Sequence, residues 1–378
     1  MGTIEKRSRT KRDGTEYHVW RARTRLRNGD ARSNTFARKV DAEAWLTTMQ
    51  AGRLDGTAAD PKRGRTTYGA WLDKWQPTRR HGSRASTLAR DDSYIANHVR
   101  PHWQDWQLAH IDRTDVVDWV GELSDKGLAP ATVAKVYQLF AASIEAAITD
   151  RYLGVSPCRS IDLPKIGKHP MRILTPGELG RLADKMDERY RALVLVAGYG
   201  GLRIGELSAL HVGDIDRKRK QVRVERTASW VKGHLHINQP KTASGRRSVA
   251  LPGFVWDALV GHLGEHSGPE IVFPAPGGGY LQPNLFRRRQ FAPAVAGAKL
   301  DGLRPHDLRH TAVSLWIASG ADVKRVAARA GHTSVSFTLD RYGHLYPDSE
   351  DDLMGALDAL GRAATEPDNV VSIRQPGA

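Results

Sequence analysis

The repeat of apolar residues changes twice along this 378-residue chain, whose length is typical of two or three domains. Strand-like alternation occupies residues 1–63, a helical repeat occupies 66–164, and helical and strand-like runs alternate over 172–365. Charge, Gly and Pro at 165–171 are typical of a linker, and 366–378 has the composition of a disordered or only locally ordered tail. The chain is therefore predicted to be multidomain and mainly α with small β-sheets: a small sheet with one helix, a helical domain and a mixed α+β domain.

The first segment combines β-forming residues with interleaved arginines. Glu16–Arg25 (EYHVWRARTR) is followed by a hairpin turn signal, Asn28-Gly29, and by a returning run at Arg32–Phe36. Asp41 is placed to cap a short helix. We expect a small sheet packed on that helix, with four arginines exposed along it: Arg21, Arg23, Arg25 and Arg27. An exposed edge strand also tolerates arginine, but the crowding of four on one short element favours contact with DNA.

The second segment repeats apolar residues at helical spacing throughout. Helices are expected to begin near Thr67, Ser86, Thr114 and Pro130, and the last of them is the longest. Its core-facing stripe consists of Val133, Val136, Tyr137, Phe140, Ile144 and Ile148. Because this segment carries no recognisable chemistry, it fits either a helical module that wraps around DNA or a plain helical bundle.

The chain is strongly basic, with a formal net charge of +15 and a pI of about 10.0. Residues 1–65 hold sixteen Lys or Arg against eight Asp or Glu, so more than half of the excess lies in the first sixth of the chain. A concentrated basic arm is what contacts with phosphates require. Basicity alone does not distinguish DNA from RNA, or either from an acidic membrane surface.

Cysteine content and hydropathy restrict the compartment. The single cysteine, Cys158, excludes a disulfide within the chain and a four-cysteine zinc site. The start of the chain, Met1–Arg12, is polar and basic, and no apolar run approaches the length of a membrane span. We expect a cytoplasmic protein with no membrane partner.

The third segment opens at a capping box, Thr175 with Glu178, and short strands are expected near Val222–Glu225, His234–Asn238 and Ser248–Leu251. The stretch PKTASGRR lies between the last two runs, so Lys241 is predicted on a hairpin loop. A flexible lysine there could reach a substrate phosphate or donate a proton. An ordinary exposed turn lysine is the alternative.

A charged residue follows a near-continuous apolar run in the stretch GLRIGEL. Arg203 comes just after Leu193–Gly200 and a Gly-Gly turn, where a charge would be poorly solvated without an anionic partner. Glu206 lies three residues on and could orient the guanidinium. On its own, this pattern is better explained by a structural Arg–Glu pair.

A third stretch, HDLRHT, opens an amphipathic helix. His306 and Arg309 are one turn apart and can therefore hydrogen-bond two oxygens of one phosphate. His306 and His310 are also spaced as zinc ligands, but Asp307 stands where the glutamate of that motif would be, and Arg309 would repel a cation. We therefore expect no metal site here and interpret His310 as a packed or hydrogen-bonded structural residue.

The fourth stretch places a Gly-His turn ten residues before a tyrosine. His332 follows Ala330-Gly331, and Tyr342 is followed by His344. A lone tyrosine in a helix is usually a core or surface residue. Its position after the other three stretches suggests a nucleophile.

The four stretches, in their order along the chain, resemble the tyrosine recombinase (phage integrase) family. The resemblance rests on the GLRIGEL arginine, the PKTASGRR lysine, the HDLRHT box, the Gly-His turn and the late tyrosine. It covers the whole third segment; Ala330 stands where the family usually has Leu. The second segment is similar in position and type to the family's core-DNA-binding domain, and the first to the arm-type domain of larger integrases.

The resemblance implies a site-specific recombinase that integrates or excises a phage or mobile element. The catalytic residues it implies are Arg203, Lys241, His306, Arg309, His332 and Tyr342, with Glu206 as an orienting residue. Tyr342 would attack a backbone phosphate to form a 3′-phosphotyrosine bond. His306 and His332 would hydrogen-bond the phosphate and help to take the tyrosine proton, and Lys241 would protonate the leaving 5′ oxygen. No cofactor is implied. The implied partners are double-stranded attachment-site DNA, three further copies of the chain in a tetramer, and host or phage factors that bend DNA or set the direction of the reaction. The implied location is the nucleoid in the cytoplasm of a bacterial host.

Other functions use the same residues differently. A relaxing topoisomerase shares the chemistry, but the basic first segment favours recombination because it could bind sites away from the exchange point. A non-catalytic DNA-binding regulator with the same fold would be expected to lose catalytic residues, and this chain has the set. A metal-dependent nuclease is the weakest alternative, and strand cleavage that persists in EDTA would exclude it.

Overall fold

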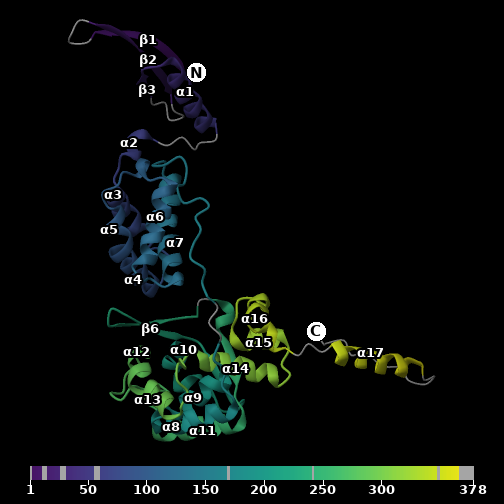
Figure 1. The fold of residues 1–378 in the computed structure, drawn as a ribbon. Helices are drawn as coiled ribbons and strands as arrows, with labels where there is room; N and C mark the ends of the chain where they lie inside the picture. Colours follow the sequence, from purple (N-terminus) through teal and green to yellow (C-terminus); the bar gives the residue numbers. More distant parts are fainter. Residues whose placement is uncertain are drawn as a thin grey trace. The chain divides into compact units, whose positions relative to one another are not determined.

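A computed structural model describes residues 2–10, 15–25, 31–54, 60–167, 171–240, 242–346 and 350–365. Its internal contacts divide the chain into two units, Met1–His169 and Pro170–Ala378, and each is considered by itself (Figure 1). Arg27, the Asn28-Gly29 turn, Lys241 and the tail at 366–378 lie outside the described residues. No helix in the described ranges is long and apolar enough to cross a membrane.

The first unit begins with an antiparallel sheet of three strands in the order β1 (Thr3–Thr10), β2 (Glu16–Arg25) and β3 (Ala31–Phe36). The predicted strand Glu16–Arg25 is confirmed with the same bounds. Strand β1 was not predicted, because its side chains are exposed almost throughout and it carries no apolar alternation. The sheet packs on α1 (Lys39–Leu54). Asp41 lies inside the first turn of α1, so its prediction as the capping residue was wrong.

Strand alternation separates the two faces of this sheet. Ala22 and Thr24 are buried, as is Ala42 of the adjoining helix α1. Successive side chains of a strand point to opposite faces. The positions of Arg21 and Arg23 therefore belong to the face opposite Ala22 and Thr24. The Arg21 guanidinium donates to Ser33 Oγ across the sheet at 3.1 Å.

The helical part of the first unit consists of α2 (Pro61–Gly64), α3 (Tyr68–Thr78), α4 (Ala85–Tyr94), the π-helix η1 (Ile95–Val99), α5 (Arg100–Trp103), the 3-10 helix η2 (Leu108–His110), α6 (Arg113–Asp125) and α7 (Pro130–Thr149). Thr67 caps α3, and α7 begins at Pro130, as predicted. Asp112 and Asp115 form a capping box at the start of α6.

An aromatic cluster forms the core of this bundle. The ring of Phe140 lies 5.0 Å from Trp103, 5.0 Å from Trp119 and 5.2 Å from Tyr68, measured between ring centroids. All four side chains are fully buried. The Tyr68 hydroxyl and Ser143 Oγ are 2.6 Å apart, so the one phenolic oxygen in the cluster is satisfied.

The second unit is a helical domain with two small sheets. Its helices are α8 (Pro176–Lys185), α9 (Glu188–Gly200), α10 (Ile204–Ser208), α11 (Gly253–Glu265), α12 (Pro283–Phe286), α13 (Ala292–Gly297), α14 (Asp307–Ala318), α15 (Val323–Ala330), α16 (Val335–Tyr342) and α17 (Glu350–Thr365), with short 3-10 or π segments η3 (Val212–Asp214), η4 (Ala243–Gly245), η5 (Arg287–Phe291) and η6 (Gly343–Leu345). Helix α9, which is apolar and mostly buried from Ala192 onward, packs against α8, α11 and α14. The Thr175–Glu178 capping box is confirmed at the start of α8.

The strands of the second unit pair differently from the sequence prediction. β4 (Ile215–Asp216), β5 (Gln221–Val224) and β8 (Arg247–Ala250) form one antiparallel sheet, and β6 (Thr227–Val231) pairs only with β7 (His234–Asn238). The PKTASGRR stretch therefore joins two separate sheets, and the predicted hairpin between the strands that flank it was wrong. The β6–β7 pairing was missed because β6 has no clear apolar alternation.

Phe140→Ala should lower the free energy of unfolding by about 3–5 kcal/mol, because a large cavity would open among three aromatic rings. Urea unfolding followed by tryptophan fluorescence measures the loss, since Trp103 and Trp119 border the cavity. Val155→Ala is the control in the same unit: its side chain is 65% exposed, and a change within about 0.5 kcal/mol is expected. Equal midpoints for the two variants would contradict the assigned core.

Candidate active site

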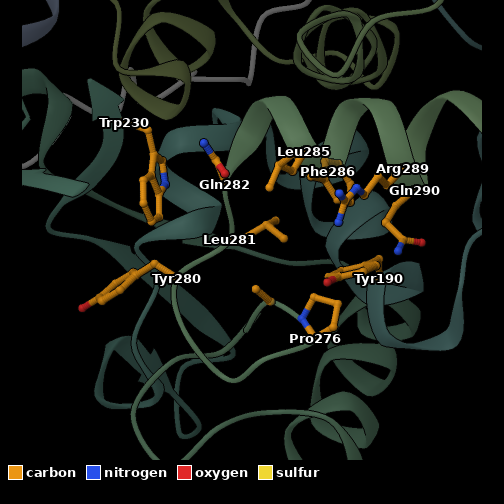
Figure 2. A pocket seen from close by; sticks show the side chains of 11 residues that line it. Tyr190, Trp230, Pro276, Tyr280, Leu281, Gln282, Leu285, Phe286, Arg289 and Gln290 are labelled. Atoms are coloured by element: carbon orange, nitrogen blue, oxygen red, sulfur yellow. The ribbon is translucent and has the colours of Figure 1, made fainter. Parts of the chain in front are cut away.

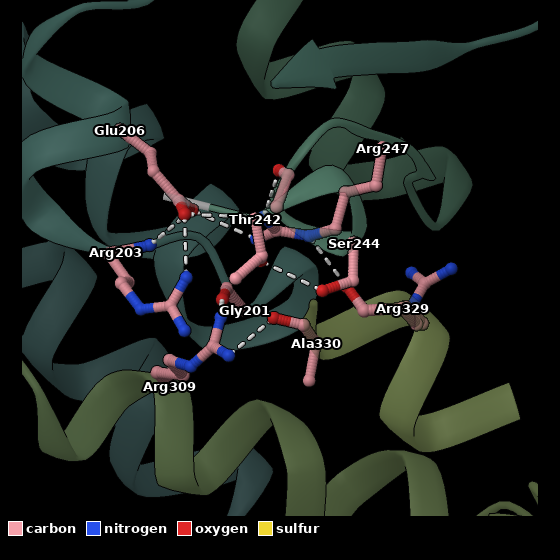
Figure 3. A network of polar contacts seen from close by, with 10 residues as sticks. Gly201, Arg203, Glu206, Thr242, Ser244, Arg247, Arg309, Arg329 and Ala330 are labelled. Atoms are coloured by element: carbon pink, nitrogen blue, oxygen red, sulfur yellow. Dashed lines mark hydrogen bonds and ion pairs between the residues drawn. The ribbon is translucent and has the colours of Figure 1, made fainter. Parts of the chain in front are cut away.

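The carboxylate of Glu206 lies between two guanidinium groups (Figure 3). Oε1 accepts from the Arg203 guanidinium at 2.8 Å, and Oε2 accepts from the Arg203 backbone N–H at 2.9 Å. Arg247 donates to both oxygens, at 2.9 Å and 3.2 Å. Glu206 and Arg247 are both almost fully buried, whereas the Arg203 side chain is 42% exposed. The predicted Arg203–Glu206 pair is thus present, and it leaves part of the Arg203 guanidinium accessible.

The backbone before Arg203 is shaped by a glycine. Helix α9 ends at Gly201, which adopts a left-handed conformation with φ of 68°. A Cβ at this position would approach the Trp316 ring to 2.6 Å. Only glycine allows this turn without displacing the ring. The turn brings Arg203 to the N-cap of α10, one turn before Glu206.

Arg247 was missed in the sequence, where the run of basic residues after Lys241 looked like an exposed loop. Besides its bonds to Glu206, its Nε donates to the Arg329 carbonyl at 2.9 Å. It therefore joins β8 to α10 and to the end of α15. Burial tends to raise the pKa of Glu206, but the hydrogen bonds and charge of Arg247, together with Arg203, outweigh burial and lower it. The carboxylate is ionised at neutral pH.

Arg309 is held by the ends of two helices. It is 3% exposed and donates to the carbonyls of Gly201, at 2.7 Å, and Ala330. These carbonyls follow α9 and end α15, where the helix macrodipole places partial negative charge. Burial and the nearby charge of Arg203 lower the pKa of Arg309 to about 9, so the guanidinium remains cationic at neutral pH.

The two predicted phosphate-binding histidines have different surroundings. His306 is exposed at the N-cap of α14, one turn from Arg309. His332 is buried after the left-handed Gly331, and its Nδ1 lies 2.8 Å from Thr338 Oγ1. Desolvation and the charge of Arg309 lower the pKa of both imidazoles, that of His332 to about 4. Both rings are therefore mainly neutral at neutral pH.

Tyr342 ends α16 with its side chain 2% exposed. Its hydroxyl oxygen lies 2.6 Å from Nδ1 of His310, and its ring is parallel to that of His332, 6.2 Å away between centroids. Burial raises the pKa of Tyr342, and the charges of Arg309, Arg341 and Arg203 oppose that rise. The prediction of His310 as a hydrogen-bonded residue is confirmed, but its partner, the expected nucleophile, was not foreseen.

The segment around Lys241 adjoins the same cluster. Lys241 itself lies outside the described residues, but Ser244 approaches Gly331 so closely that a Cβ on the glycine would lie 2.9 Å from the Ser244 carbonyl oxygen. The hydroxyl oxygens of Thr242 and Ser244 lie 2.9 Å apart and form a hydrogen bond (Figure 3). Within the described ranges, no three His, Cys, Asp or Glu side chains come together as a metal site requires.

A separate apolar cavity of about 200 Å³ lies in the same unit. Figure 2 shows aromatic rings around it, with Arg289 and Gln290 at its edge. Its lining includes Tyr190, Trp230 and Tyr280, and none of the polar residues described above.

The site combines two guanidinium groups, two neutral imidazoles and a buried phenol from α10, α14, α16 and the turn after α15. Such an arrangement suits attack of a tyrosine on a phosphodiester, because fixed cations stabilise the charge that develops on the phosphate oxygens. The helical fold with small sheets and this site together are typical of enzymes that break and rejoin phosphodiester bonds.

Known proteins of this class are similar to the chain. The phage integrase family matches residues 172–348. The prophage phiRv2 integrase of Mycobacterium tuberculosis is 28% identical over 337 residues, which cover 86% of this chain and 88% of that protein. The structure of the Tn1549 transposon integrase in complex with a circular intermediate DNA aligns with a TM-score of 0.67 and 19% identity, over 78% of this chain and 99% of that chain.

A lambda integrase tetramer bound to a Holliday junction aligns with a TM-score of 0.58 and 18% identity, over 87% of this chain and 96% of that chain. Over residues 172–348, which hold the site described above, the chain matches the phage integrase family, the tyrosine recombinases. It is a site-specific recombinase of the kind encoded by mobile elements.

Glu206→Gln should lower the free energy of unfolding by about 3–5 kcal/mol at pH 7, since two guanidinium groups would lose the buried charge between them. Because the folded-state pKa of Glu206 is lowered, this contribution is complete above the ordinary carboxyl pKa of 4.5 and is lost as the pH falls below it. The difference from wild type should therefore shrink in urea unfolding at acid pH. Asp184→Asn removes the exposed ion pair with Arg191 and should change stability by less than about 1 kcal/mol. A pH-independent difference for Glu206→Gln would contradict the assigned charge.

Proposed function

We propose that the protein cleaves and rejoins DNA through a 3′-phosphotyrosine bond formed by Tyr342. The observation that carries this proposal is the placement of a buried tyrosine among groups that bind phosphate, with Arg203 and Arg309 close enough to influence its pKa. Arg203 and Arg309 would bind the non-bridging oxygens of the scissile phosphate. Their planar, permanently charged forks suit two oxygens of a phosphate better than a lysine would.

His306 and His332 would add hydrogen bonds to the same phosphate, and Glu206 would orient Arg203. Lys241 would protonate the 5′ oxygen as it leaves. In the forward step the Tyr342 oxygen bonds to phosphorus and the bond from phosphorus to the 5′ oxygen breaks. Since the phosphotyrosine bond keeps the energy of the phosphodiester, a 5′ hydroxyl can reverse the reaction and rejoin the strand.

The proposal assigns each segment a part in binding DNA. Residues 1–63 form an arm-type DNA-binding domain, 66–164 a core-binding domain, 172–365 the catalytic domain and 366–378 a tail. Arg21 and Arg23, which belong to one face of the arm sheet, would contact phosphates there; Arg25 and Arg27 are proposed on the sequence alone. A sheet face with several arginines can follow the backbone of a duplex.

Recombination exchanges strands between two duplexes and so requires four active sites. We therefore propose a homotetramer on double-stranded attachment sites, as the lambda integrase neighbour forms on a Holliday junction. The reaction would integrate or excise a phage or mobile element with the help of DNA-bending and directionality factors. It would take place in the cytoplasm of a bacterial host, at the nucleoid.

Tyr342→Phe should abolish covalent capture of a nicked duplex that carries the attachment site, because the ring keeps its packing but loses the attacking oxygen. The adduct is measured as a protein–DNA band that survives denaturation. Duplex binding, measured in parallel, should remain within a few-fold of wild type. An adduct formed by the Tyr342→Phe variant would show that another residue is the nucleophile.

Replacing both Arg21 and Arg23 with Gln should weaken binding of the full chain to arm-site DNA. The slope of log K against log salt should fall by about 2, since each phosphate contact contributes about 0.9. Arg38→Gln is the control, because Arg38 adjoins α1 and its side chain is 83% exposed. An unchanged slope in the double variant would place the DNA on another surface.

A further inference from the structure

The hydroxyl of Tyr342 has one hydrogen-bond partner among the residues that the structure describes, and this partner is His310. The 2.6 Å separation from Nδ1 is short for a phenol and an imidazole, and both side chains are buried, His310 at 5% exposed and Tyr342 at 2%. A neutral imidazole whose proton is on Nε2 accepts a hydrogen bond at Nδ1. In this arrangement the phenol O–H points at the nitrogen.

Neither of the other two histidines is placed to accept that proton. Nδ1 of His332 bonds to Thr338, the His332 ring lies 6.2 Å from the phenol between centroids, and the hydrogen bonds of the described residues join the Tyr342 hydroxyl to His310 and not to His332. His306 stands exposed at the N-cap of α14 beside Arg309 and contacts the edge of the His310 ring, 4.9 Å between centroids. His306 therefore contacts His310, the hydrogen-bond partner of Tyr342, rather than the hydroxyl of Tyr342 itself.

We propose that His310 is the catalytic group that takes the hydroxyl proton of Tyr342 during attack and returns it during religation. This inference rests on the proposed function of Tyr342 as the nucleophile. As the tyrosine oxygen bonds to phosphorus, its proton passes to His310 Nδ1 and gives an imidazolium. The 5′ oxygen leaves with a proton from Lys241. Religation reverses each transfer, so no proton or electron remains unaccounted for.

The surroundings of His310 keep its ring neutral, so that Nδ1 can accept the hydrogen bond. The groups that face it are His306, Asp307 and Arg309 on its own helix, Arg341 and Tyr342 on α16, and His332 after α15. Desolvation, followed by the influence of His306 and Arg341, lowers the pKa of His310 to about 4. The ring is therefore neutral, and free to accept a proton, throughout the neutral range. The anionic phosphate that binds next to Arg309 would stabilise the imidazolium when it forms.

The decisive variant is His310→Asn, whose side-chain oxygen can occupy the place of Nδ1 and hold the phenol but cannot take its proton at neutral pH. The measurement is the single-turnover rate of adduct formation on the nicked duplex at saturating protein, from pH 6.5 to pH 9. Wild type should be nearly independent of pH. His310→Asn should be slower at pH 7 by a factor on the order of 10²–10³. Its rate should rise almost ten-fold per pH unit, because tyrosinate would then have to form by loss of the proton to solvent.

His306→Asn is the matched control on the same helix. It should also be slower, through its lost phosphate contact, but should keep the flat pH profile of wild type. A second variant, His310→Ala, leaves a cavity shaped like imidazole, and added imidazole should restore at least ten-fold of its lost rate without affecting His306→Asn. This variant keeps the test decisive if asparagine disturbs folding, which duplex binding reports.

A His310→Asn rate within about three-fold of wild type and equally flat with pH would overturn the proposal, as would His310→Ala that binds the duplex but gains nothing from imidazole. The wild-type and Tyr342→Phe samples separate this inference from the proposed function. If wild type forms the adduct and Tyr342→Phe does not, the nucleophile stands whatever His310 does. If wild type forms no adduct, both proposals fail.

Discussion

The buried carboxylate of Glu206 is the contact on which the rest of the site depends. It receives hydrogen bonds from Arg203 and from Arg247. Arg247 also donates to the carbonyl of Arg329 in the last turn of α15. One ionised group thus connects α10, β8 and α15. Removing one member of such a buried pair leaves an unpaired charge, which is usually far more costly than the pair is worth. The geometry of the phosphate-binding groups is therefore set by interactions that do not involve phosphate.

The site carries more positive charge than its own acidic groups balance. One carboxylate lies near three guanidinium groups, those of Arg203, Arg247 and Arg309. The neighbouring histidines add little positive charge at neutral pH, because their pKa values are lowered. An anion entering this site meets dipoles and charges that are already oriented. Such preorganisation is the main means by which enzymes stabilise developing charge.

Sequence patterns predicted the local features well. The strand Glu16–Arg25, the capping box at Thr175 and the Arg203–Glu206 pair each depend on residues close together in the chain, where periodicity and capping rules apply directly. Apart from the cap wrongly assigned to Asp41, which is a local error, the errors have one physical origin. The residues that pair with β8 lie 23 to 29 positions away, at Gln221–Val224, rather than in the neighbouring strand, and the bonds of Arg247 and His310 span 41 and 32 residues. Such choices depend on packing that no local pattern records.

Arg309 has a consequence for how variants of this enzyme are interpreted. Its guanidinium holds together the ends of α9 and α15, and the same group is proposed to bind the scissile phosphate. The packing of the two helices and the proposed chemistry thus both depend on this one side chain. A variant of Arg309 is expected to lose turnover both because phosphate binding is weakened and because the two helix ends are held less firmly. Turnover and stability must be measured together to separate these two effects. The reverse also follows: because this arginine joins two helix ends, a chain without catalysis would still gain stability from it, so its presence in a sequence is a weaker sign of activity than the presence of the tyrosine.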